Sequence, residues 1–275
     1  MEVICLQSGS SGNCVYVECG DVRLLIDAGI SARQVDLRLK SLGKESDGLS
    51  ALLISHDHGD HTRCMGTVHR RFDLPIHISR PTLRTVQRKR TQGKLGRIHY
   101  FESDQSFRVG HVTVETIPTP HDAVDPVAFV IDDGEKRLGV LTDLGHSFRR
   151  LGEIIPTLDA VVLESNYDPA LLIESSYPDM LKTRIAGERG HISNEDAAEL
   201  LRQASPDLQW AVLAHLSEEC NAPDVALRTH RKMLGSSNLE LSCADRYAAS
   251  AIMKIRPPKV SKSPPPRLKQ QLLFG

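Results

Sequence analysis

The sequence predicts a layered α/β fold in one large domain. Short apolar runs of strand length recur along the chain, and amphipathic stretches with helical spacing lie between them. Several apolar runs end directly in a histidine, an aspartate or a glutamate, which is where layered α/β folds collect ligands. The 275 residues, 40% of them hydrophobic and 25% charged, suffice for one ample core. We therefore predict a domain over residues 1–254 and a tail over residues 255–275.

The apolar runs and the amphipathic stretches place the elements along the chain. Strands are predicted at residues 3–6, 15–17, 22–26, 52–54, 76–78, 97–101, 112–117, 127–131, 138–141, 160–163 and 210–213. Helices are predicted after the N-cap Ser31 through Leu42, over 65–72, over 195–203 after Ser193 or Asn194 as N-cap, and over 224–234 with Gly235 closing the helix. The loop SGSSGN at 8–13 either brings its backbone close to a ligand or is a plain turn.

The stretch 51–61, ALLISHDHGDH, holds the densest set of candidate metal ligands. His56 and His58 follow a buried strand and point to the same side of an extended segment. Asp60 and His61 lie where the chain turns into the next helix, so they can face a second point a few ångströms away. The spacing predicts half of a two-metal site, and the alternative is a solvated histidine-rich loop.

Further candidate ligands stand at the ends of other predicted strands. These are His121 in TIPTPHDAVDP, Asp143 in LGVLTDLGH, Glu164 in VVLESNYD and His215 in VLAHL. Asp27 also follows a strand, in LLIDAG, and is predicted to hold the ligand loop by hydrogen bonds and not to bind metal.

The order H-x-H-x-D-H, then a single His, a single Asp and a final His, resembles the metallo-β-lactamase superfamily. The resemblance implies a four-layered αββα sandwich with two divalent metal ions, zinc or manganese, at one edge. It also implies that one ion is held by His56, His58 and His121, the other by Asp60, His61 and His215, and that Asp143 bridges both. A metal pair of this kind activates water for attack on an ester, an amide or a phosphodiester.

Two further residues match ribonuclease Z-like phosphodiesterases of this superfamily: Glu164, and His191 in RGHISNEDAAELL. A carboxylate beside an imidazole favours the charged imidazolium, so His191 is predicted to protonate the leaving oxygen. With Asp60 these two form the predicted catalytic set. The alternative is that Glu164 and His191 only cap helices.

More specifically, the chain is similar to the YycJ/WalJ-type branch in seven segments: SGSSGN, SHDHGDH, PHDAVDP, TDLG, LESN, YPDMLKTRIAGERGHISNEDAAELL and LAHLSEECN. This resemblance implies a DNA exonuclease of 5′-3′ polarity in repair or replication. One departure is Tyr167, where a histidine is expected. The alternatives are a small-molecule phosphodiesterase or thioester hydrolase, and an RNA-processing nuclease. The 72 residues from Asp143 to His215 are too few for the large insertion domain of the ribonuclease J group, which disfavours that RNA-processing type.

Charge and cysteine content bear on partners and location. The net charge of −1 gives no global argument for nucleic acid. Residues 80–97 carry seven basic residues and no acid, either as a solvated helix face or as a phosphate contact, and Lys182, Arg184 and Arg189 allow the same two interpretations. The six cysteines form no C-x-x-C pair, and no signal peptide or membrane span is visible. We therefore expect reduced cysteines, a cytoplasmic location and no membrane partner.

The tail differs in composition from the rest of the chain. RPPKVSKSPPPRLKQQLLFG is rich in proline and basic residues and has no acid, so disorder or extended polyproline is expected from about residue 256 to 269. Its end, QQLLF, resembles the peptide by which DNA replication and repair proteins bind the sliding clamp. On that resemblance, Leu273 and Phe274 fill an apolar pocket and Gln270 makes the orienting hydrogen bonds. The alternative is an apolar end that folds back onto the domain.

Overall fold

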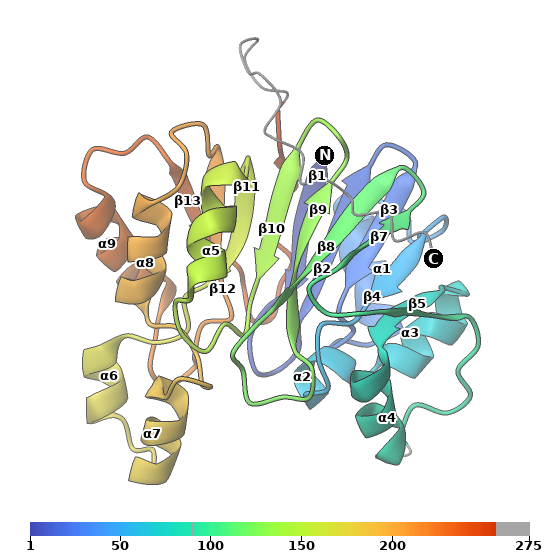
Figure 1. The fold of residues 1–275 in the computed structure, drawn as a ribbon, viewed down its shortest axis with the longest axis horizontal. Helices are drawn as coiled ribbons and strands as arrows, with labels where there is room; N and C mark the ends of the chain where they lie inside the picture. The colour runs from blue at the N-terminus through green and yellow to red at the C-terminus, as the bar shows by residue number, and fades with distance from the viewer. Residues whose placement is uncertain (90, 257–275) are drawn as a thin grey trace, which may run out of the picture.

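Two seven-stranded sheets packed face to face form the centre of the protein, as Figure 1 shows for the computed structural model, which describes residues 1–89 and 91–256. The first sheet has the order β14 (Met253–Lys254), β1 (Glu2–Gln7), β2 (Cys14–Cys19), β3 (Val22–Ile26), β4 (Ala51–Leu53), β5 (Ile76–Ser79) and β6 (Ile98–Phe101). The second has the order β13 (Glu240–Cys243), β12 (Trp210–Ala214), β11 (Ala160–Glu164), β10 (Arg137–Leu141), β9 (Val127–Asp132), β8 (Val112–Pro118) and β7 (Ser106–Val109).

Helices cover the outer faces of both sheets. The helices are α1 (Ala32–Ser41), α2 (Gly59–Thr62), α3 (Met65–Phe72), α4 (Arg80–Arg88), α5 (Arg149–Ile154), the 3-10 turn η1 (Ile155–Thr157), α6 (Pro169–Glu174), α7 (Asp179–Ala186), α8 (Asn194–Arg202) and α9 (Pro223–Leu234). Of these, α2, α6 and α7 do not cover a sheet face but lie at the lower edge in Figure 1. Val35 of α1 and Leu83 of α4 are buried against the first sheet. Leu151 of α5 and Leu200 of α8 are buried against the second sheet.

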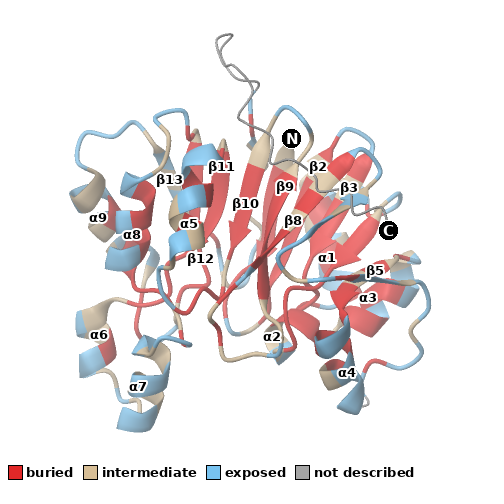
Figure 2. Cartoon of the chain, in the orientation of Figure 1, coloured by how far each residue is buried: buried red, intermediate tan, exposed pale blue. Residues whose placement is uncertain are grey.

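A third apolar cluster lies between the two sheets and joins them. It contains Val17 and Leu24 from the first sheet, and Phe129 and Val162 from the second. Figure 2 shows this burial along the strands, with exposed residues gathered on the helices and loops. The order helix, sheet, sheet, helix confirms the predicted four-layered αββα sandwich.

Strand direction gathers the ligand loops at one edge of the molecule. In the first sheet, β3, β4, β5 and β6 pair in parallel, and in the second sheet β10, β11, β12 and β13 do the same. The carboxyl ends of parallel strands meet at one edge. The two sheets turn these ends to the same side, the lower edge in Figure 1, where α2 lies.

Several predicted helix boundaries are confirmed by their hydrogen bonds. The Ser31 hydroxyl accepts from the backbone N–H of Gln34 at the start of α1, and the Ser193 hydroxyl accepts from Asp196 N–H at the start of α8. Such caps satisfy backbone donors that have no partner within the helix. Gly235, with φ of +59°, ends α9 as predicted.

The folded contacts reach slightly past residue 254. Ile255 is buried among the strands, and the backbone of Arg256 exchanges two hydrogen bonds with the Gln209 side chain. Most of the predicted tail, with the whole QQLLF segment, lies outside the described residues. The division into a domain and a tail therefore stays a prediction.

All six cysteines are free; Cys5, Cys14, Cys19 and Cys220 are buried, and Cys64 and Cys243 are partly buried. Among the described residues, no helix is both long enough and apolar enough to cross a membrane.

Candidate metal centre

All seven predicted metal ligands come together at the lower edge of the sheets. One ligand atom each from His56, His58 and His121 lies within 4.8 Å of the other two, and the same holds for Asp60, His61 and His215. Asp143 belongs to a third such group, with His56 and His61. The ligand role of these residues stays a prediction, but their proximity is a property of the fold.

The backbone at two strand ends takes a sparsely populated conformation to present its side chain. Asp143 follows β10 with φ of +58°, and His215 follows β12 with φ of +55°. Residues other than glycine rarely adopt this left-handed conformation, and where they do, they cluster at functional sites. The strain indicates that these two side chains are held in place by their surroundings.

Asp143 lies at the middle of the cluster. Its Oδ2 atom is 3.3 Å from His61 Nε2, and its Oδ1 atom is 3.5 Å from His121 Nε2 and 3.8 Å from His215 Nε2. Its carboxylate therefore faces both halves of the cluster, as the bridging role requires. Asp60 is closer to one half, with Oδ2 3.3 Å from His61 Nε2 and 3.4 Å from His215 Nε2.

The protein fixes the orientation of the imidazole rings through their outward nitrogens. His61 Nδ1 lies 2.7 Å from Asp27 Oδ2, and His121 Nδ1 donates to the carbonyl of Gly190 at 2.8 Å. Asp27 also accepts from the backbone and the hydroxyl of Ser55, so it holds the ligand loop as predicted. Hydrogen bonds of this kind fix the tautomer of histidines that bind metals.

Two atoms of the predicted metal ligands have no hydrogen-bond partner among the described residues. They are His56 Nε2 and Asp143 Oδ2, and both are buried. Buried polar atoms nearly always have a hydrogen-bond partner in folded proteins, so two unpaired atoms in one cluster need an explanation. A divalent metal ion explains them, because imidazole nitrogens and carboxylate oxygens are its preferred ligands.

The buried carboxylates of the cluster raise the pKa of two neighbouring histidines. Burial disfavours the charged form of His61, but Asp143, Asp60 and Asp27 together raise its pKa well above the ordinary value. Burial likewise opposes charging of His215, yet Asp143 and Asp60 raise its pKa to about 9. Without metal, protons on these rings neutralise the carboxylates, and metal binding is expected to displace them.

Glu164 and His191 form a pair beside the cluster. Glu164, at the end of β11, is fully buried, and its Oε2 atom accepts from the backbone N–H of Leu144 at 2.7 Å. Its Oε1 atom lies 2.6 Å from His191 Nδ1. Both carboxylate oxygens thus form hydrogen bonds, and Glu164 also lies in a group of possible ligand atoms with Asp143, His191 and His215. His191 keeps its other nitrogen, Nε2, available, and its ring lies 5.1 Å from the His121 ring.

Two residues that the sequence analysis did not single out also contact the cluster. The side-chain amide of Asn13, at the end of the SGSSGN loop, lies 3.0 Å from both Asp60 Oδ2 and His61 Nε2. Asp122 Oδ1 lies 3.7 Å from His58 Nε2 and 3.6 Å from His121 Nε2. The only sequence signal for Asp122 is its place directly after His121.

The three cations considered as phosphate contacts have internal partners. Arg184 forms an ion pair with Asp122 at 2.6 Å, Lys182 donates to the carbonyl of Ile173, and Arg189 donates to the carbonyl of His121. Arg184 and Arg189 therefore support the loop that carries His121. Tyr167, which replaces the expected histidine, is buried in an apolar cluster with Leu172 and Cys220 rather than exposed at the metal centre.

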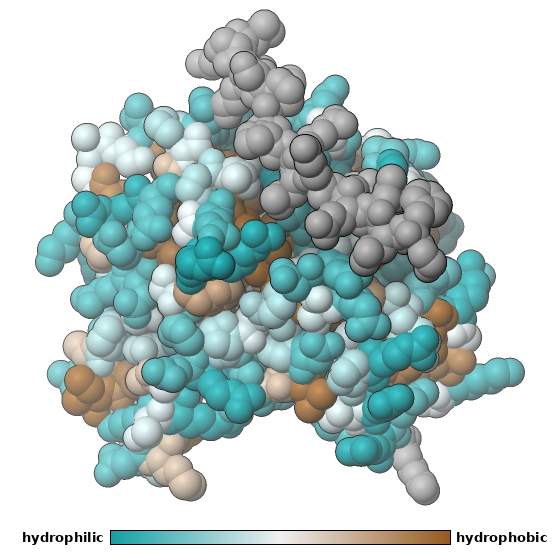
Figure 3. Space-filling model, in the orientation of Figure 1, coloured by the Kyte–Doolittle hydropathy of each residue, from teal (hydrophilic) through white to brown (hydrophobic). Residues whose placement is uncertain are grey.

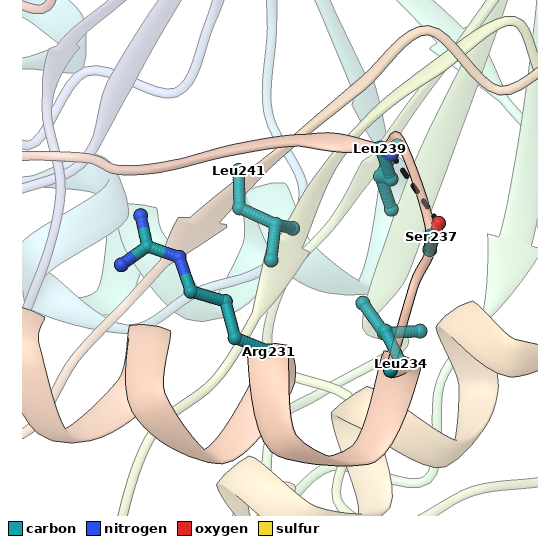
Figure 4. Close-up of a pocket in the computed structure, with 6 residues that line it drawn as sticks. Arg231, Leu234, Ser237, Leu239 and Leu241 are labelled. Atoms are coloured by element: carbon teal, nitrogen blue, oxygen red, sulfur yellow. Dashed lines mark hydrogen bonds between the residues drawn. The ribbon is translucent and has the colours of Figure 1, made fainter.

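A separate hollow lies between the end of α9 and β13 (Figure 4), lined by Arg231, Leu234, Gly235, Ser237, Leu239 and Leu241. Glu240 pairs with Trp210 at the amino end of β12, whereas His215 leaves the carboxyl end of that strand. The hollow is therefore at the opposite edge from the candidate metal centre.

The sequence matches a family model described as a beta-lactamase superfamily domain, over residues 22–216. The chain belongs to this superfamily. The YhfI protein of Bacillus subtilis, a metallo-beta-lactamase fold protein, superimposes with a TM-score of 0.70 at 16% identity, covering 90% of this chain and 98% of that one. This likeness shows the fold alone.

Two relatives show which branch of the superfamily the chain belongs to. The chain is 32% identical over 237 residues to exodeoxyribonuclease WalJ of Streptococcus pneumoniae serotype 2, covering 85% of this chain and 88% of WalJ. It is 31% identical over 222 residues to exodeoxyribonuclease YycJ of Bacillus anthracis, covering 80% of this chain and 84% of YycJ. The predicted YycJ/WalJ-type branch is confirmed, and with it the class of metal-dependent hydrolases.

Proposed function

We propose that the protein is a two-metal exonuclease that degrades DNA from the 5′ end in repair or replication. The observation that carries this proposal is the cluster of seven potential ligands beside the hydrogen-bonded pair of buried Glu164 and partly exposed His191. The relatives named as exodeoxyribonucleases support DNA as the substrate. The proposal includes a cytoplasmic location, where such a nuclease meets its substrate in bacteria.

The donor set matches two ions in which Asp143 is shared. His56, His58 and His121 would hold one ion, and Asp60, His61 and His215 the other, with zinc or manganese as the metals that suit imidazole and carboxylate together. When bound, such ions supply Lewis-acid chemistry and an activated water for phosphodiester cleavage.

Protein residues supply the remaining chemistry. Glu164 fixes Nδ1 of His191 by a hydrogen bond of 2.6 Å, so the proton on Nε2 can be delivered to the leaving oxygen. Arg184 holds Asp122, which lies against two of the histidines and keeps their loop in place. Asn13 donates to Asp60 and orients its carboxylate.

The test compares polymers of one sequence with Mn²⁺ or Zn²⁺: duplex DNA, single-stranded DNA and RNA, labelled at either end. We expect a 5′ label to appear first in the shortest products, and Asp60→Ala to abolish cleavage. No cleavage of any polymer would exclude a nuclease. Hydrolysis of a chromogenic diester that does not respond to salt, without polymer cleavage, would favour the small-molecule hydrolase instead, because contacts to several phosphates make binding salt-dependent.

We further propose that the tail recruits the enzyme to the sliding clamp. The support is the sequence QQLLF at the end of a proline-rich segment, with Gln270, Leu273 and Phe274 as the contacts. A tethered peptide raises the local concentration of the enzyme without a tight DNA interface. The test is titration of a labelled peptide of residues 268–275 with purified clamp, beside a peptide with Leu273→Ala and Phe274→Ala. Equal binding of both, or binding of neither at tens of micromolar clamp, would remove this role.

A further inference from the structure

Helix α4 is attached to both loops that carry the first group of histidines. At its carboxyl end, Lys89 Nζ donates to the carbonyl of Asp57 at 2.9 Å, and Asp57 stands between His56 and His58 in the sequence. Near its amino end, the Thr82 hydroxyl donates to the carbonyl of Val124 at 2.9 Å, in the loop that follows His121. Figure 1 shows α4 at the lower edge, on the same side as α2. The helix therefore borders the candidate metal centre.

The exposed side of α4 is a row of arginines. Arg80, Arg84 and Arg88 are exposed and stand four residues apart, so they follow one face of the helix over about 12 Å. The opposite face buries Leu83 and Val86 against the first sheet. Hydrophilic side chains predominate over α4 in Figure 3.

These arginines lack the acidic partners that some arginines on other helices have. Within residues 1–89 and 91–256, none of the three forms an ion pair. On α5, α8 and α9, by contrast, an acid lies within 2.8 Å of an arginine in each case: Arg149–Glu153, Arg202–Glu199 and Arg228–Asp224. A cationic row without internal neutralisation attracts an anionic partner.

An aromatic ring stands at the amino end of the row. The Arg80 guanidinium lies 3.9 Å from the centre of the Tyr100 ring, and Tyr100 is 43% exposed. Arginine and tyrosine planes are surfaces on which unpaired bases stack. Phosphate-binding groups and a stacking group are thus combined on one surface beside the metal centre.

We propose that Arg80, Arg84, Arg88 and Tyr100 form the surface that binds the nucleic acid strand next to the cleaved end. This rests on the proposed function, because it takes a polynucleotide as the substrate. The arginines contact successive parts of the phosphate backbone, and Tyr100 stacks on a base. Because Lys89 and Thr82 tie α4 to the ligand loops, a strand bound on α4 is held in a fixed position relative to the metal centre.

The test uses the full chain with Arg84→Ala and Arg88→Ala together. The matched control is Arg231→Ala with Lys232→Ala, which removes the same charge from exposed positions of α9 at the opposite edge. Binding of a labelled single-stranded 20-mer is followed by fluorescence anisotropy in EDTA, which stops metal-dependent cleavage. We expect Kd to rise about tenfold in the α4 variant, and the slope of log Kd against log salt to fall by about 1.4, since each phosphate contact on a single strand contributes about 0.7.

Further measurements separate a charge effect from damage to the fold. Arg84→Lys with Arg88→Lys keeps the charge and should restore most of the affinity, whereas a structural role would leave the loss in place. With metal present, kcat/KM on the 20-mer should fall much more than kcat/KM on bis(p-nitrophenyl) phosphate, which is too short to reach from the metal centre along α4.

The outcomes distinguish the two proposals. Equal weakening in the α9 control, an unchanged Kd in the α4 variant, or no binding of the 20-mer by the unmodified protein would overturn the α4 surface. If the unmodified protein binds the 20-mer through α4 but cleaves no polymer, the binding surface stands and the nuclease function fails.

Discussion

At the scale of single residues, the cluster depends most on Asp143, whose carboxylate faces both halves. Because its φ is +58°, the test substitution is Asp143→Asn, as asparagine tolerates this conformation and only the charge is lost. We expect metal content after dialysis to fall below a tenth of the unmodified value, and activity to fall with it. Metal content is measured by atomic emission. Asp104→Asn is the control, since exposed Asp104 has a similar φ of +62°. Retention of both metals by Asp143→Asn would remove its bridging role.

His191 is expected to behave differently from the ligands. His191→Ala should keep the metal content and lower kcat on DNA by about 10²–10⁴-fold, the usual contribution of a general acid. The loss should be smaller on p-nitrophenyl diesters, because their leaving group departs without a proton. His111→Ala is the control, because His111 is exposed and its side chain forms an ion pair with Asp21, away from the cluster. An equal loss on both kinds of substrate would show that His191 is not the acid.

The sequence predicted the residues that a motif marks and missed those that only the fold brings near. His56, His58, Asp60 and His61 share one short segment, so their common function could be read directly. Asn13 and Asp122 reach the cluster only because the SGSSGN loop and the loop after β8 fold against α2. Neither residue has a distinctive spacing, and without a structure their partners are unknown.

At the scale of elements, the ligand loop is positioned by close backbone packing at Gly29. The carbonyl of Asp60 accepts from Asn13 N–H, and Gly29 N–H donates to the carbonyl of Asn13, so three segments cross at this point. A Cβ atom on Gly29 would overlap the carbonyl oxygen of Asp60. Only a residue without a side chain fits there.

Gly29→Ala is therefore expected to destabilise the protein and to weaken metal binding together. We expect a loss of roughly 2–4 kcal/mol in the free energy of unfolding, comparable to other steric overpacking in a closed site. Gly59→Ala is the matched control, because a Cβ atom on Gly59 would meet no other residue within 4 Å, and Gly59 is in the same helix as Asp60. Urea unfolding and metal titration measure both effects. Similar results for the two variants would contradict the packing argument.

The elements that the sequence did not predict have weak patterns for a physical reason. Strands β7 and β13 lie at sheet edges and alternate between exposed and half-buried residues, so they have no continuous apolar run. Helix α7 buries no residue, and its exposed Met180 and half-buried Leu181 give no amphipathic stripe. Central strands such as β11, buried at every position, were predicted because burial on both faces requires a continuous apolar sequence.

At the scale of the whole molecule, the two ends of the described chain pair with each other at the edge of the first sheet, where β14 is the edge strand. β1 pairs with β2 on one side and with β14 on the other, so residues 2 and 254 are neighbours across the sheet. Trp210 Nε1 donates to the carbonyl of Lys254, which links β14 to the second sheet. Sequence patterns predicted the layers, but not the pairing of β1 with β14, which lie about 250 residues apart in the sequence. The reason is that β14 has only two residues, too few to form a recognisable pattern.

Glu2 supports the pairing of β1 with β14 by ion pairs with Lys254 and Lys44. The hydrogen bonds from these two lysines lower the pKa of Glu2 to about 2, against an ordinary value of 4.5. Because the folded pKa lies below the unfolded one, the stabilisation is complete above pH 4.5 and is lost as the pH falls towards 2. Glu2→Gln should therefore lower the free energy of unfolding by about 1 kcal/mol at pH 7, as expected for a partly exposed network, and by less at pH 3.

Urea unfolding of both proteins at pH 7, 5 and 3 measures this difference, and 1 M NaCl should reduce it at pH 7, because salt screens exposed charges. Glu135→Gln is the control, since Glu135 is exposed in a turn and forms no ion pair with the described residues. A difference in the free energy of unfolding that is the same at pH 3 and pH 7 would mean that Glu2 stabilises the pairing of β1 with β14 by packing or by neutral hydrogen bonds. A difference that disappears with acid and with salt would assign the stabilisation to the charge of Glu2, and would place the acid-sensitive contact of the first sheet where β1 pairs with β14.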